Sequence, residues 1–440
     1  MLRKTMLYAY KNRKKIVHHP FLPSSFEEGK SRNDIISCRE GEVDNFKEYT
    51  VRNVSYEMIL YLKSNYMRCL KFDIFSIFYL ALVLFLPLIL HSQTNPNFDF
   101  SLGIDYSAAE QMLDYFDHRI GDTKLVATLR GNQLVAATSV MLARTEKTDD
   151  DFSQQLELAR NNARFESDVY GFLPAKNHIQ EIRKLLLEIK HRQLDRRIVA
   201  TIASFFPEQA KISTRFSVYF VVIGNERASA FVRHVIWNYD VPIFVSEETG
   251  EPVIVVNLAR IIERQNNVEA QFVEVLSTTA HECFHAALSV LKKSLPESIK
   301  AKNVAEQLLD IVQNEGVAYY LSLQTHIGNR TPSQQWFSVT AQAIEELNRV
   351  LLEMTSPKLT RARAQELMMN ANLSGSFEGN YGATAGMRMA YEIDTRLGRP
   401  TLNATLMTGS GSFISAYIQA CLRGQNLPKI NRHVLSLLQQ

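Results

Sequence analysis

The stretch TTAHECFHAALSV, residues 278–290, decides how this sequence is interpreted. It contains the pattern H-E-x-x-H, in which His281 and His285 stand four positions apart in a segment of helical periodicity. On an α-helix that spacing places both imidazoles on one face, about one turn apart along the axis, so they can converge on one metal ion. Glu282 lies beside the first histidine, where a carboxylate can accept a proton from a zinc-activated water molecule. The pattern therefore predicts a Zn²⁺ site with its own base, provided that the chain supplies a third ligand.

Glu315 is the candidate for that third ligand. A second helix is expected after the motif, and its apolar residues Val304, Leu308 and Ile311 form a stripe that continues to Glu315. A carboxylate on an apolar stripe faces the interior, where an unpaired charge is costly and a metal ion is one natural partner. The alternative is that Glu315 pairs with an arginine or caps a polar cavity. Gly316, directly after it, would let two helices approach closely.

The rest of the sequence predicts an α+β fold that is predominantly α-helical. Residues 93–215 are expected to form a helical N-terminal region. Runs rich in β-branched and aromatic residues at 215–224, 240–250 and 251–261 predict a small β-sheet directly before the motif. The helix that carries H-E-x-x-H is expected over about residues 266–292, because apolar positions recur along it at helical spacing and Pro296 follows it.

The segment before residue 93 is far more apolar than the rest of the chain. Residues 74–90, IFSIFYLALVLFLPLIL, carry no charge, which fits the lower end of the roughly 17 to 25 residues that span a bilayer. We expect residues 67–92 to be a signal peptide or a transmembrane anchor, with residues 1–66 as an extension upstream of a true start at Met67. The alternative keeps Met1 as the start and leaves an uncleaved anchor. Both interpretations predict an exported protein that is periplasmic, secreted or membrane-anchored outside the cytoplasm.

Composition, net charge and cysteine content argue against some classes of binding partner and metal site. The chain of 440 residues is 46% hydrophobic and 22% charged, as is typical of globular proteins. Its net charge of +3 is too small to predict nucleic-acid binding as the main activity. Its 4 cysteines include no C-x-x-C pair, which argues against a cysteine-based zinc ribbon. Cys283, inside the motif, is interpreted as a small buried hydrophobic residue.

The motif HECFH followed by NEGVA resembles the gluzincin clan of zinc metallopeptidases. By that resemblance, His281, His285 and Glu315 match the zinc ligands and Glu282 matches the catalytic base. Leu288 and Leu291 stand where the metzincin class carries glycine and histidine, so that class is excluded. The resemblance implies a zincin-like catalytic region over residues 216–440, with a helical C-terminal part.

The chain departs from the best-known gluzincin families in three ways. The gap between His285 and Glu315 is longer than usual, Tyr319 stands where thermolysin-like enzymes place an aspartate, and a Gly-Ala-Met-Glu-Asn motif is absent. The sequence is most similar to an uncharacterised bacterial family of predicted zinc-dependent peptidases. That similarity extends to NYGATAGMRMAYEIDTRLGRP, residues 380–400, and covers most of residues 93–440.

Transition-state stabilisation needs a hydrogen-bond donor aimed at the developing oxyanion, and zincins often use a tyrosine or a histidine for it. Tyr381, in a Gly-rich segment predicted to be a loop over residues 374–386, is the first candidate for this catalytic role, and Tyr319 is the second. Plain packing is the alternative for both tyrosines. Arg399 could bind a substrate carboxylate, but its place at a predicted helix end favours a structural role.

These observations together predict an exported zinc metallopeptidase that hydrolyses peptide bonds of a peptide or protein substrate. Two alternatives remain open at this point. One is an exported, non-enzymatic helical binding protein. The other is a zinc hydrolase that acts on a non-peptide amide or ester.

Overall fold

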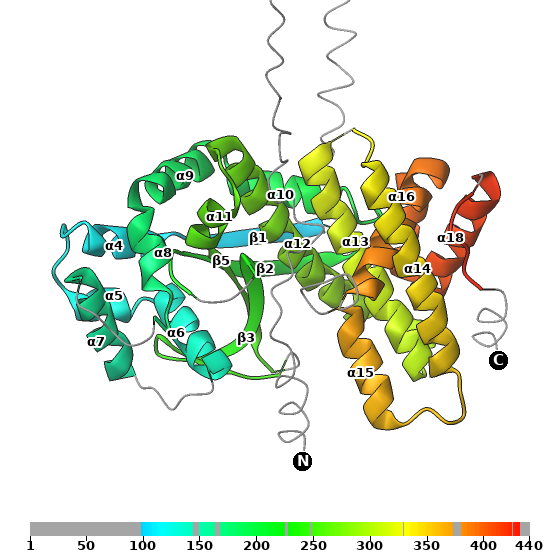
Figure 1. Ribbon diagram of the computed structural model, residues 1–440, viewed down its shortest axis with the longest axis horizontal. Coiled ribbons are helices and arrows are strands. Elements are labelled where there is room, and N and C mark those ends of the chain that lie inside the picture. Colours follow the sequence, from blue (N-terminus) through cyan, green and yellow to red (C-terminus); the bar gives the residue numbers. More distant parts are fainter. Residues whose placement is uncertain are drawn as a thin grey trace, which may run out of the picture. The chain divides into compact units, whose positions relative to one another are not determined.

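The computed structural model describes residues 98–143, 149–162, 168–224, 228–246, 249–328, 330–372, 380–424 and 426–431 (Figure 1). The predicted extension over residues 1–66 and the apolar segment within 67–92 lie outside these described residues. Within the described ranges, none of the helices combines the length and the hydropathy that crossing a membrane requires.

A five-stranded mixed sheet precedes the helix that carries the motif. Its strands stand in the order β1-β2-β5-β3-β4. β1 pairs with β2 and β2 with β5 in parallel, whereas β3 pairs with both β5 and β4 in antiparallel orientation. The strands are β1 (Phe98–Asp105), β2 (Ile212–Val221), β3 (Ala230–Asn238), β4 (Val241–Phe244) and β5 (Glu251–Asn257).

The two faces of the sheet carry different helices. On one face, the rings of Phe98 and Phe206 lie 5.7 Å apart between centroids, and Phe206 is 5.3 Å from Phe284 of the motif helix. On the other face, Gly131 lies so close to the sheet that a Cβ atom there would be 3.2 Å from Val221. The helices before and around the sheet are α4 (Ser107–Phe116), α5 (Thr123–Ala127), α6 (Arg130–Ala143), α7 (Asp149–Arg160), α8 (Phe172–Asn177), α9 (Ile179–His191), α10 (Leu194–Ala203) and α11 (Leu258–Arg264).

The motif lies on α12 (Val268–Ser294), and Glu315 lies on α13 (Val304–Ile327). Each of these helices begins at an asparagine cap. The Asn267 side chain accepts a hydrogen bond from the backbone N–H of Ala270, and Asn303 accepts one from that of Glu306. A short 3₁₀ turn, η1 (Glu297–Ile299), connects the two helices.

The C-terminal part of the described chain is helical and lies on the other side of α12 from the sheet (Figure 1). It consists of α14 (Gln334–Met354), α15 (Arg361–Ala371), α16 (Tyr381–Leu397), α17 (Arg399–Thr408) and α18 (Ser410–Arg423). The predominantly helical α+β architecture predicted from the sequence is therefore confirmed.

Three details of the sequence prediction are corrected. Residues 93–215, expected to be mostly helical, contain α4 to α10, but β1 also lies in this region and pairs with β2, and the predicted boundary at residue 215 falls inside β2. β3 was not predicted at all. The described part of the expected loop over residues 374–386 is helical from Tyr381 onward, since α16 packs its glycines against neighbouring helices rather than using them in a loop.

Candidate metal centre

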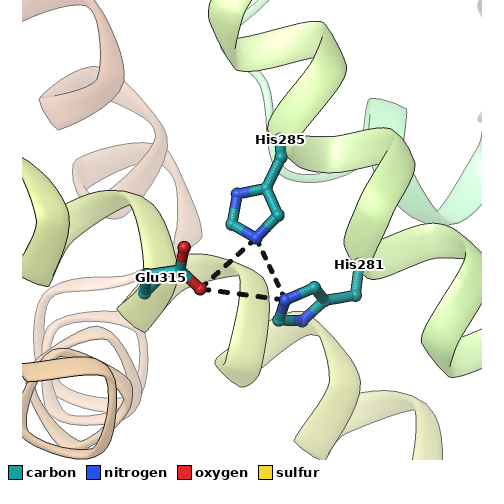
Figure 2. Close-up of side chains that lie close together, drawn as sticks. All are labelled: His281, His285 and Glu315. Carbon is teal, nitrogen blue, oxygen red and sulfur yellow. Dashed lines mark hydrogen bonds and ion pairs between the residues drawn. The ribbon is translucent and has the colours of Figure 1, made fainter. Parts of the chain in front are cut away.

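The side chains of His281, His285 and Glu315 converge between α12 and α13 (Figure 2). The two imidazole Nε2 atoms are 3.0 Å apart. Glu315 Oε2 lies 3.4 Å from Nε2 of His285 and 3.9 Å from Nε2 of His281. Within the described part of the chain, no other group of three His, Cys, Asp or Glu side chains is arranged to hold a metal ion.

These separations fit zinc. Ligands at about 2.0–2.2 Å from a tetrahedral Zn²⁺ ion stand roughly 3.3–3.5 Å from one another, and the three observed distances bracket that range. Two imidazoles and one carboxylate also form a donor set that is common in catalytic zinc sites, where one position remains for water. The residues present therefore fit the metal that the sequence predicts.

The antiparallel pairing of α12 and α13 brings the third ligand to the motif. Lys292, near the end of α12, forms an ion pair of 3.6 Å with Asp310, near the start of α13. At the opposite end of the pair, Glu274 Oε2 lies 3.0 Å from Nε2 of His326. Between these two contacts the register places Glu315 opposite the two histidines.

Each of the three side chains also forms a hydrogen bond through its other polar atom, the one that does not face the shared centre. Nδ1 of His285 lies 2.9 Å from Oδ1 of Asn314, and Nδ1 of His281 lies 3.3 Å from Oγ of Ser322. An amide oxygen can only accept, so Nδ1 of His285 donates to it, and Nε2 is the ring nitrogen that faces the other two side chains. The other oxygen of Glu315, Oε1, accepts a 2.7 Å hydrogen bond from Nδ2 of Asn372.

The charges of the three ligands are strongly coupled. Burial disfavours the protonated form of His285, but the charge and hydrogen bond of Glu315, together with Glu282 and Asn314, outweigh burial and raise the pKa of His285 above its usual value. Burial together with the neighbouring His285 lowers the pKa of His281. Burial also disfavours the Glu315 carboxylate, yet the combined interactions with His285, His281 and Asn372 outweigh burial and lower the pKa of Glu315. The cluster thus holds an anion and one positive charge, which a divalent cation can replace with release of the proton.

Glu282 lies in the same environment, one position after the first histidine. Burial raises the pKa of its carboxyl group to about 7, although the charge of His285 opposes this effect. A carboxyl group with a pKa near neutrality can both take up and release a proton at physiological pH. This property is the one that a general base in hydrolysis needs.

The two tyrosine candidates lie in different places. The ring of Tyr319, one turn after Glu315, packs edge-on against His281 with 4.8 Å between centroids. Tyr381 is the first residue of α16, is 1% exposed, and donates its hydroxyl proton to the Leu367 carbonyl at 3.0 Å. The structure therefore brings Tyr319, and not Tyr381, to the metal ligands, because the hydroxyl of Tyr381 is already used between α15 and α16.

Two other sequence interpretations have a clear structural outcome. Arg399 donates to Asp394 Oδ2 from both Nε, at 3.0 Å, and a terminal nitrogen, at 2.6 Å. It thus ties the start of α17 to α16, as expected of a structural residue. Cys283 is fully buried and belongs to the hydrophobic core, as expected.

Sequence reasoning missed the three residues that form hydrogen bonds with the candidate ligands. Asn314 and Ser322 lie on the same helix as Glu315, so a helical projection of α13 could have found them. Asn372 gave no signal, because it follows Glu315 by 57 positions and its place was set only by the packing of α15.

A protein-family model with the description "Putative zinc dependent peptidase (DUF5700)" matches residues 123–425. That range contains all of α12 and α13, and therefore all three residues of the candidate metal centre. No curated protein and no solved structure matches the chain.

Proposed function

The chain belongs to the family described as "Putative zinc dependent peptidase", and on that premise we propose that it is a zinc metallopeptidase. His281, His285 and Glu315 would hold the metal. The single observation that carries the proposal is the convergence of three ligand atoms, 3.0, 3.4 and 3.9 Å apart, from two helices. A bound zinc ion would supply a Lewis acid that acidifies water and polarises a carbonyl group.

We propose Glu282 as the general base. Its carboxylate takes a proton from the attacking water and then passes that proton to the leaving amine. The raised pKa supports this role, because a carboxyl group of ordinary pKa would hold the proton too weakly at neutral pH. Glutamine at this position has the same shape and cannot accept the proton, which makes Glu282→Gln the informative variant.

We propose Tyr319 as the donor to the developing oxyanion. Its ring touches His281, and burial raises the pKa of its hydroxyl to about 12, so the hydroxyl keeps its proton at neutral pH. A hydrogen bond with Asn380 opposes this shift, as expected when an amide N–H donates to the phenol oxygen. In that arrangement the phenol's own proton remains available for the substrate.

Metal analysis and a peptide assay test the proposal together. The purified chain should retain one zinc per molecule after dialysis, and Glu315→Ala should lose it. Glu282→Gln should keep the zinc while hydrolysis of a peptide library falls by about 10²–10⁴-fold. Glu345→Ala is the matched control, since Glu345 is an exposed glutamate on α14. A wild-type chain that binds no zinc when zinc is offered would refute the proposal. Cleavage of ester or non-peptide amide substrates alone would correct the substrate class.

We also propose that the protein acts outside the cytoplasm. The support is the charge-free run at residues 74–90 with basic residues before it. Fractionation of cells, followed by determination of the first residue of the mature protein, tests this proposal. A chain that begins at Met1 and stays in the cytoplasmic fraction would contradict it.

A further inference from the structure

We propose that Asn372 is a positioning residue for the third metal ligand, which its amide orients by donating to Oε1 of Glu315. This inference rests on the proposed function, because it concerns how the chain prepares Glu315 to hold zinc. The hydrogen bond of 2.7 Å from Asn372 Nδ2 engages one oxygen of the carboxylate. The other oxygen, Oε2, is then the one that faces His281 and His285.

The carboxylate of Glu315 needs such a partner. The last side-chain torsion of a glutamate is soft, so a carboxylate without a hydrogen bond rotates over a broad range. Each rotation moves Oε2 relative to the two imidazoles. An amide that donates to a charged carboxylate forms a stronger bond than a neutral pair does. The Glu315 side chain is only 12% exposed, so little room remains for water to replace the amide.

The backbone around Asn372 is well placed for this task. Asn372 is the C-cap of α15, and its backbone N–H donates to the Met369 carbonyl. The start of α16 is packed tightly onto this point, since a Cβ atom at Gly382 would lie 2.8 Å from the Cβ atom of Ala371. The position of Asn372 is therefore fixed by contact between α15 and α16.

The same helix α16 also fixes the other partner of the hydrogen bond. A Cβ atom at Gly316 would lie 2.3 Å from the backbone carbon of Gly386 on α16. α13 thus packs backbone to backbone on α16 at the residue next to Glu315. Because α16 contacts both α13 and α15 so closely, the donor Asn372 and the acceptor Glu315 have a fixed position relative to each other.

Zinc affinity tests the inference without an activity assay. The full chain is stripped of metal, and its zinc dissociation constant is measured by competition with a chromophoric chelator. Loss of a partner that orients a metal ligand commonly weakens binding 10–100-fold. We expect Asn372→Ala to raise the dissociation constant by about 10-fold or more. Asn372 is exposed, so the variant should fold, and thermal unfolding of the metal-free chain verifies this.

Two further variants separate orientation from packing. Asn372→Leu keeps the size of the side chain but donates nothing, so it should bind zinc as weakly as Asn372→Ala. Asn370→Ala, two positions earlier on α15, is the matched control and should bind as tightly as the wild type. The inference is wrong if both Asn372 variants bind within about threefold of the wild type, or if leucine restores the affinity that alanine loses. A wild-type chain without zinc binding would instead overturn the proposed function, and this inference with it.

Discussion

Gly316→Ala is the most demanding test of how α13 is positioned. The added Cβ atom would lie 2.3 Å from the carbonyl carbon, 2.4 Å from Cα and 2.8 Å from the oxygen of Gly386. All three are backbone atoms of α16, so no side chain can rotate away. Since non-bonded carbon atoms pack at about 3.5–4.0 Å, the two helices would have to separate by roughly 1 Å.

The magnitude follows from two opposing effects. Overpacking of a tight interior costs about 1–3 kcal/mol, and a clash with helical backbone belongs at the upper end. Alanine in place of glycine within a helix stabilises by about 0.5–1 kcal/mol. The clash wins, and we expect the free energy of unfolding to fall by about 2 kcal/mol.

Urea unfolding of the metal-free chain measures this change. Gly411→Ala on α18 is the matched control, because a Cβ atom there would meet no atom within 4 Å. The control should be as stable as the wild type or slightly more stable, since only helix propensity acts at that position. If Gly316→Ala is as stable as Gly411→Ala, the close approach of α13 and α16 does not exist and the reasoning fails.

Three further predictions concern residues around the metal centre. Asn314→Ala should weaken zinc binding by about 10–100-fold in chelator competition, because His285 loses the acceptor that fixes its ring. Tyr319→Phe should lower kcat by about 10²–10³-fold at unchanged zinc content, as measured with a peptide substrate and by metal analysis. His326→Gln should destabilise the chain below pH 6.5 and have less effect at higher pH, as followed by urea unfolding across pH. Burial opposes protonation of His326, but the hydrogen bond and charge of Glu274, together with a hydrogen bond to the Ser322 backbone, outweigh burial and raise the pKa of His326 above 6.5. Its contribution to stability is therefore complete below pH 6.5 and is lost as the pH rises through the raised pKa.

Each of these predictions can fail in a distinct way. Unchanged zinc affinity in Asn314→Ala would mean that His285 is oriented without the amide. Loss of zinc from Tyr319→Phe, which keeps the ring and removes only the hydroxyl, would mean that the hydroxyl supports metal binding itself and does not act on the oxyanion alone. A destabilisation by His326→Gln that does not depend on pH would show that His326 acts by packing alone.

Helical periodicity is a local property, so it could be recognised in the sequence. The spacing of His281 and His285 placed both rings on one face of α12 before any contact between helices was known. The apolar stripe of α13 likewise turned Glu315 toward the interior. The alternation of Phe98, Phe100, Leu102 and Ile104 with polar residues in β1 was also present, and it could have predicted the strand that was missed.

The sequence by itself therefore indicated most of the helices, the pair of histidines with Glu282 beside them and the inward-facing third carboxylate, because each depends on neighbours within a few turns. Only the tertiary structure decided that α12 and α13 run antiparallel in the register that joins these ligands. It also decided that Tyr319 and not Tyr381 lies beside them, and that Asn372 reaches Glu315. These contacts depend on the packing of distant helices through surfaces such as Gly316 and Gly386, and no local pattern specifies which surfaces will meet.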